Sequence, residues 1–106
     1  MIPEGAVQRR YPRVQVLIDC QVEGTSGRAP TRLSELSLGG CYVDTRTQFS
    51  VGASVTIYAA FPAGDVVLSG HVLYVQPTYG FGVGFDDLPD TTRQQLHAFV
   101  AQVGCA

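Results

Sequence analysis

The chain has 106 residues, a length that fits one domain able to bury a sizeable core without disulfides or a structural metal. Hydrophobic residues make up 45% and charged residues 15%, and no apolar run approaches the ~20 residues that cross a bilayer. The formal net charge is −2, whereas general nucleic-acid binders carry a strongly basic face. We therefore expect a soluble globular protein with no membrane insertion and no nucleic-acid partner.

Export signals and a disulfide framework are not indicated. Residues 1–7 lack the charged start and apolar centre of a secretory signal, so we expect a flexible N-terminus and a cytoplasmic protein. Three cysteines are an odd number, and Cys20, Cys41 and Cys105 match no metal or redox spacing. Because Cys20 and Cys41 fall in strand-like segments, we expect them to be free and to pack as small hydrophobic residues.

Catalytic motifs are absent from the sequence. There is no nucleophile elbow and no phosphate-binding loop, and His71 and His97 are isolated from each other and from cysteine. An acidic group at Asp86, Asp87 and Asp90 precedes a predicted helix, where negative charge is favourable without a metal ion. We predict that the protein is not an enzyme and holds no metal or cofactor.

Alternating apolar and polar residues predict six short strands. Leu17 is the one apolar residue on the polar side of the first strand. Glycine-rich or proline-containing turns and one loop at 46–54 separate the strands. The predicted strands cover residues 14–22, 31–36, 41–45, 55–61, 66–75 and 79–85.

The sixth predicted strand has one aromatic and apolar face and one face of glycine. Tyr79, Phe81, Val83 and Phe85 alternate with three glycines. Glycine on one face of a strand permits close backbone approach or sharp curvature, which a small closed barrel requires.

The last segment changes from strand to helix periodicity. Apolar residues recur at positions i, i+3, i+4 and i+7, namely Leu96, Phe99, Val100 and Val103. A helix from residue 88 or 90 should therefore end at Gly104 and lie across a barrel opening or against a sheet. Six short strands and one helix indicate a small all-β barrel with a C-terminal α-helix.

A basic cluster at residues 8–13 is the clearest candidate for binding. It holds Arg9, Arg10 and Arg13 among only seven cationic residues, all of them arginine. Pro12 disfavours helix for the residue before it, so the segment should be extended, with Arg9 and Arg13 on one side and roughly 13 Å apart. Arginine forks suit bidentate contacts with phosphate or a base edge.

A polar pair, Glu35 and Ser37, precedes the double glycine Gly39-Gly40. In a strand both side chains point to one face, which would present a carboxylate and a hydroxyl side by side. The carboxylate could accept hydrogen bonds from guanine while arginine donates to the opposite base edge. Alternatively, Glu35 pairs with Arg10 or Arg13 on the surface, a contact worth at most about 1 kcal/mol.

These two motifs together resemble the PilZ family. Arg9 to Arg13 matches its Arg-x-x-x-Arg motif, and Glu35-Leu36-Ser37-Leu38-Gly39-Gly40 resembles its (Asp/Asn)-x-Ser-x-x-Gly motif. A Val-x-Tyr run, the Gly82-Val83-Gly84-Phe85 segment and the closing helix are also similar. The resemblance covers residues 8–103 and leaves 104–106 as a tail.

The resemblance implies a six-stranded antiparallel Greek-key β-barrel that acts as a bacterial receptor for cyclic di-GMP, a second messenger that regulates motility or biofilm formation. It implies that Arg9 and Arg13, assisted by Arg10, hold phosphates and guanine edges. The barrel would contribute the second motif, namely Glu35, Ser37, Gly39 and Gly40. Glutamate replaces the family's Asp or Asn, which extends the carboxylate by about 1.5 Å.

We therefore hypothesise that a free N-terminal arm folds over cyclic di-GMP and signals to a protein partner, in a monomer or weak dimer. The alternative is a degenerate PilZ-like adaptor in motility or pilus assembly that binds no nucleotide. A barrel that binds single-stranded nucleic acid has suitable arginines and aromatic residues but the wrong net charge.

Overall fold

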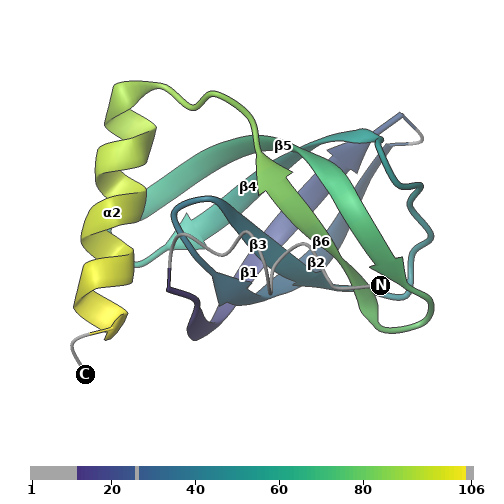
Figure 1. The fold of residues 1–106 in the computed structure, drawn as a ribbon, viewed down its shortest axis with the longest axis horizontal. Coiled ribbons are helices and arrows are strands. Elements are labelled where there is room, and N and C mark those ends of the chain that lie inside the picture. Colours follow the sequence, from purple (N-terminus) through teal and green to yellow (C-terminus); the bar gives the residue numbers. More distant parts are fainter. Residues whose placement is uncertain (1–11, 26, 105–106) are drawn as a thin grey trace.

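A computed structural model describes residues 12–25 and 27–104. It contains six β-strands followed by one α-helix (Figure 1). The predicted flexible segment 1–7 and the tail beyond residue 104 lie outside the described residues. The elements are β1 (Val14–Gly24), β2 (Gly27–Leu36), β3 (Gly40–Asp44), β4 (Ser54–Phe61), β5 (Gly64–Gln76), β6 (Gly80–Phe85) and α2 (Asp90–Gly104).

The strands form a closed antiparallel barrel in the order β1-β2-β3-β6-β5-β4. Closure is made by β1 and β4, where Cys20 lies opposite Ala59. The chain therefore crosses from β3 to β4 over the end of the barrel and returns through β5 and β6, which is a Greek-key path. The predicted fold class is confirmed.

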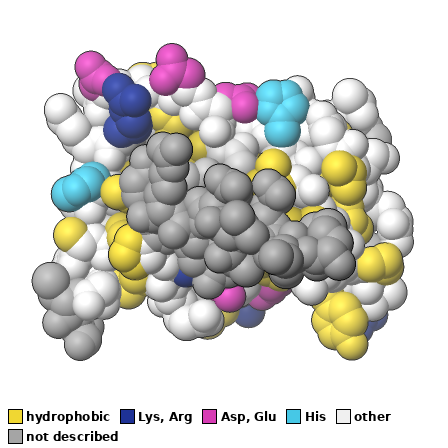
Figure 2. Space-filling model, viewed as in Figure 1, with side chains coloured by type: hydrophobic (Ala, Val, Ile, Leu, Met, Phe, Trp, Pro, Cys, Tyr) yellow, Lys and Arg dark blue, Asp and Glu magenta, His cyan; other side chains and the backbone are white. Residues whose placement is uncertain are grey.

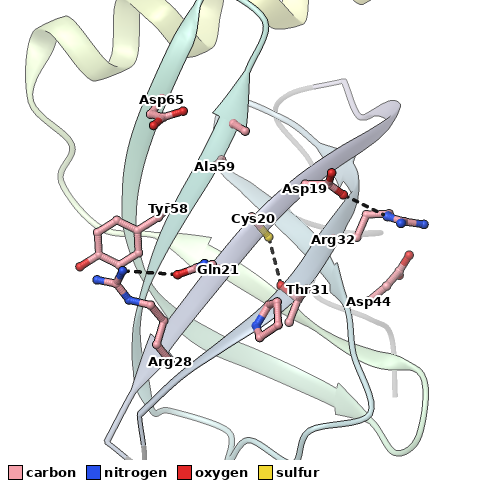
Figure 3. A pocket seen from close by; sticks show the side chains of 12 residues that line it. Asp19, Cys20, Gln21, Arg28, Thr31, Arg32, Asp44, Tyr58, Ala59 and Asp65 are labelled. Atoms are coloured by element: carbon pink, nitrogen blue, oxygen red, sulfur yellow. Dashed lines mark hydrogen bonds and ion pairs between the residues drawn. The ribbon is translucent and has the colours of Figure 1, made fainter.

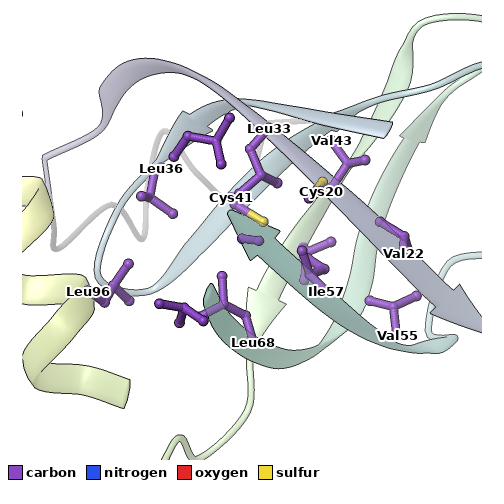
Figure 4. Packing of buried hydrophobic residues seen from close by; sticks show 14 of the residues in the cluster. Cys20, Val22, Leu33, Leu36, Cys41, Val43, Val55, Ile57, Leu68 and Leu96 are labelled. Atoms are coloured by element: carbon purple, nitrogen blue, oxygen red, sulfur yellow. The ribbon is translucent and has the colours of Figure 1, made fainter. Parts of the chain in front are cut away.

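Every second side chain along the strands points inward, and these apolar side chains fill the barrel interior (Figure 4). Val22, Leu33, Val43, Ile57 and Leu68 are each 0% exposed, and they come from five different strands. Cys20 and Cys41 are free and lie in this core, as predicted.

The one apolar side chain on the polar side of β1 is exposed, in step with the unbroken alternation of buried and exposed residues along this strand. The pairing of β1 with β2 shifts between Gln15 and Ile18. Leu17 lies in this shift and is 74% exposed.

Glycines in β6 allow side chains of neighbouring strands to lie directly on its backbone. A Cβ added to Gly82 would overlap the ring of Tyr74, and one added to Gly84 would come within 3.1 Å of Leu73. The expected close approach is thus present. Tyr79, by contrast, was predicted to continue the apolar face, and this was wrong because it lies in the β5–β6 turn and is 74% exposed.

The helix lies at one end of the barrel in Figure 1 and closes the core there. Leu96 and Val100 are its buried residues, and the Phe99 ring packs on Phe61 with centroids 4.8 Å apart. The helix ends at Gly104, as predicted. No helix among residues 12–25 and 27–104 has the length and apolar character needed to span a membrane.

The second strand begins earlier than predicted. We expected it at residue 31, but it starts at Gly27, and Pro30 pairs with Gln21 of β1. Only the later half of β2, from Arg32 onward, pairs with β3. Proline lacks a backbone N–H and is therefore tolerated at a position where the strand has no second neighbour that would need that donor.

Candidate functional site

The start of β1 and the end of β2 bring together two of the predicted site residues. Arg13 Nη1 donates to Glu35 Oε1 at 3.0 Å, and the side chains are 29% and 32% exposed. Val14 pairs with Leu36 and Gln15 with Glu35, which places Arg13 at the position where the chain enters the barrel. The pair is accessible to solvent, so its attraction is modest.

Ser37 has a different environment from the one predicted. We expected its hydroxyl to stand beside the Glu35 carboxylate, but β2 ends at Leu36 and Ser37 is only 8% exposed. Its Oγ accepts hydrogen bonds from the N–H groups of Gly39 and Gly40, both at 3.1 Å, and lies 3.3 Å from the Gly40 carbonyl oxygen. The hydroxyl therefore holds the turn between β2 and β3.

The two glycines of this turn fit tightly against β6. A Cβ on Gly40 would overlap the carbonyl oxygen of Val83, because the β3 and β6 backbones lie side by side there. The Phe85 N–H donates to the Gly39 carbonyl oxygen at 2.9 Å. Gly39 is itself exposed, so backbone is accessible at the turn.

Arg9 and Arg10 lie outside the described residues, so of the predicted arginines only Arg13 has a described position. The structure brings Arg13 to Glu35 and places the turn containing Ser37, Gly39 and Gly40 directly after β2. The predicted surface contact between Glu35 and an arginine is thus present, with Arg13 as the partner.

Two further residues adjoin Glu35 and were not predicted from the sequence. The amide of Gln15 lies 3.5 Å from Glu35 Oε2. Tyr42 of β3 lies directly opposite Glu35 in the strand register. Alternation could have placed both side chains on the barrel exterior, but only the register shows that they flank Glu35.

The Tyr42 ring leans over β6 toward β5. Its hydroxyl donates to Gln76 Oε1, and its centroid lies 6.2 Å from that of Tyr74. Partial burial raises the pKa of the Tyr42 phenol, and the nearby Tyr74, Asp44 and Glu35 raise it further. The phenol therefore stays neutral and can donate a hydrogen bond.

A separate open groove crosses the outer faces of β1, β2 and β4 (Figure 3). At one end Arg28 stacks on the Tyr58 ring at 4.1 Å and donates to Gln21, while at the other Arg32 lies 3.6 Å from Asp19. Among the predicted site residues that the structure describes, none lines this groove. Its arginines are already paired with neighbouring groups, so the groove is not assigned to the site.

The acidic residues before and in α2 form side-chain pairs. Arg93 lies 2.5 Å from Asp90 and 3.9 Å from Asp87, and His71 Nδ1 lies 2.7 Å from Asp86 (Figure 2 shows acidic, basic and histidine side chains along this edge). Within residues 12–25 and 27–104, no three His, Cys, Asp or Glu side chains are grouped so that they could hold a metal ion.

Comparison with known proteins identifies the family. The PilZ domain profile matches residues 7–102, and a search of curated protein sequences finds no match. The chain therefore belongs to the PilZ domain family, whose members are receptor and effector modules for cyclic di-GMP.

Solved structures show the same fold. The PilZ domain of YcgR from Escherichia coli, with c-di-GMP, is 18% identical with a TM-score of 0.75, and the match covers 92% of each chain. The inhibitor of motility MotI from Bacillus subtilis is 16% identical with a TM-score of 0.77, covering 92% of this chain and 51% of that one. The MrkH–c-di-GMP complex from K. pneumonia is 17% identical with a TM-score of 0.77, covering 92% and 52%.

Proposed function

We propose that this domain binds cyclic di-GMP on the barrel exterior where β1 begins and β2 meets β3. The observation that carries the proposal is the pairing of Arg13 with Glu35 at 3.0 Å beside the Ser37–Gly40 turn. These positions correspond to the two sequence motifs of the PilZ family. Arg9 completes the first motif in the sequence, and Arg10 follows it directly.

The chemistry of the pair suits a guanine dinucleotide. A guanidinium donates two hydrogen bonds to a phosphate or to guanine O6 and N7. A carboxylate accepts from the guanine N1 and N2 donors. Since the Arg13–Glu35 contact is partly exposed and modest in energy, a ligand that offers both groups better partners can replace it.

We further propose that ligand binding draws the segment containing Arg9, Arg10 and Arg13 over the dinucleotide, and that the new surface is read by a protein partner. MotI, which has the same fold, is described as an inhibitor of motility. The absence of a nucleic-acid partner, a cytoplasmic location and a monomer or weak dimer remain predictions.

The test is calorimetric titration of cyclic di-GMP into the wild type and the Arg13→Ala variant. A charged hydrogen bond contributes about 1.5–3 kcal/mol, so Arg13→Ala should weaken binding roughly tenfold to a hundredfold. Arg93→Ala is the matched control, because this arginine is exposed and pairs with Asp90 on α2. It should bind like the wild type.

Two outcomes would change the proposal. No heat from the wild type at high micromolar ligand would reject the receptor function. Tighter binding by Glu35→Asp would show instead that the longer side chain weakens the site, since aspartate restores the residue found in the family motif.

The second candidate is an adaptor that binds a protein but no nucleotide. It is favoured by the ion pair itself, because Glu35 already engages Arg13 and also adjoins Gln15. An adaptor predicts no heat with cyclic di-GMP from the wild type and from Glu35→Asp alike.

A further inference from the structure

The strand register places an aromatic residue beside Glu35 on the outside of the barrel. Glu35 and Tyr42 are directly opposite each other in β2 and β3. Directly opposed residues project to the same face of a sheet, with Cβ atoms roughly 5 Å apart. The Tyr42 side chain therefore leaves the barrel wall beside Glu35, and its ring extends from there over β6, so that a base as large as guanine in contact with the Glu35 carboxylate can reach the ring.

The Tyr42 ring has a fixed support on one side. A Cβ built on Gly80 would come within 3.0 Å of the ring, so glycine is what lets the ring lie close to the β6 backbone. Tyr74 packs beside it, tilted by 33°, and lies over Gly82 in the same way. The hydrogen bond from the Tyr42 hydroxyl to Gln76 fixes the outer end of the ring.

Half-burial leaves the remainder of this ring open to solvent. A flat side chain that is held against glycine backbone and keeps one part exposed is suited to stacking with a planar base. The carboxylate alongside it suits the N1 and N2 edge of guanine. Both groups can then contact one base, at its face and at its edge.

We propose that Tyr42 is a base-stacking residue of this site and contributes to its selectivity for guanine. This inference rests on the proposed cyclic di-GMP function and adds a residue outside both sequence motifs. The hydroxyl acts as a positioning group through Gln76, while the ring makes the contact with the base.

The first experiment is calorimetry with cyclic di-GMP on Tyr42→Leu, Tyr42→Phe and Tyr79→Leu. Leucine fills similar space without an aromatic face, so Tyr42→Leu should bind roughly fivefold to a hundredfold more weakly. Tyr42→Phe keeps the ring and should stay within about threefold of the wild type. Tyr79→Leu is the matched control, because Tyr79 is 74% exposed in the β5–β6 turn.

A second measurement separates stacking from a structural role. The chain has five tyrosines and no tryptophan, so tyrosine emission reports directly on the protein. Cyclic di-GMP should quench part of the wild-type emission, and that part should be lost in Tyr42→Phe even though binding is retained. Melting temperatures of all variants show whether Tyr42→Leu remains folded. If Tyr42→Leu is unfolded, the quenching measured with Tyr42→Phe alone tests the stacking role.

The outcomes distinguish this inference from the proposed function. Wild-type affinity in a folded Tyr42→Leu, or undiminished quenching in Tyr42→Phe, would overturn the stacking role while leaving the receptor function intact. No binding by the wild type would overturn both.

Discussion

The hydroxyl oxygen of Ser37 accepts hydrogen bonds from two consecutive turn amides, those of Gly39 and Gly40, in a side chain that is 8% exposed. The Ser37 N–H also donates to the Gly40 carbonyl oxygen at 2.9 Å. These bonds fold the chain back so that Gly40 can enter β3 against Val83. At the scale of single residues, the serine supports the surface on which Glu35 lies.

Ser37→Ala should therefore destabilise the fold. Removing the hydroxyl leaves two amide donors without their acceptor, which costs about 1–3 kcal/mol in the free energy of unfolding. Urea denaturation of both proteins measures the difference. Ser34→Ala is the control, because its hydroxyl donates to Asp44 on the surface, and its effect should stay within about 0.5 kcal/mol. Equal losses in the two variants would contradict a turn-holding role for Ser37.

Among the elements, α2 completes a core that the strands leave open at one end. Leu96 is 1% exposed and belongs to the same cluster as the strand residues, as Figure 4 shows. Leu88, in the segment before the helix, is also buried. The helix is thus part of the barrel core and not an appendage to it.

Truncation of the central helix residue tests this arrangement. Leu96→Ala should lower the free energy of unfolding by about 2–5 kcal/mol, because a buried leucine leaves a cavity. Gln95→Ala changes the exposed neighbour and should change stability by less than about 0.5 kcal/mol. Thermal and chemical unfolding report both values. A Leu96→Ala protein as stable as Gln95→Ala would mean that the helix is only loosely attached.

Most elements could be predicted because their side chains alternate along the local sequence. The helix was visible from the spacing of Leu96 and Val100, and β6 from Phe81 and Val83. The predicted start of β2 was too late. Proline usually interrupts a strand, and Pro30 is accommodated in β2 because at this position the strand pairs with β1 alone. Local pattern does not contain that information.

The site was only partly predictable for the same reason. The motifs located Arg13 and Glu35, but strand alternation put the Ser37 hydroxyl on the wrong side because the chain leaves β2 before this residue. Tyr42 and Tyr74 were invisible as a pair. Their strands, β3 and β5, lie on either side of β6 in the closed barrel, and the glycines of β6 leave room for the two rings to meet above it.

Closure of the whole barrel also removes ionisable groups from water. Burial raises the pKa of the Cys41 thiol far above its ordinary value of 9.0, and the nearby Cys20 raises it further. The pKa of Cys20 is itself raised, chiefly by burial. These thiols therefore ionise more readily in the unfolded chain than in the folded barrel, so their ionisation favours unfolding of the whole molecule.

Stability should consequently fall in alkaline solution. Because the folded pKa of Cys41 lies above the unfolded value, its contribution is fully present below about pH 9 and declines above it, by about 1.4 kcal/mol at pH 10. Urea denaturation at pH 7 and pH 10 measures the decline. Cys41→Ala removes the titrating thiol and should lose less between the two pH values than the wild type, whatever its stability at pH 7. Equal declines in the two proteins would show that the Cys41 thiol does not link folding to pH.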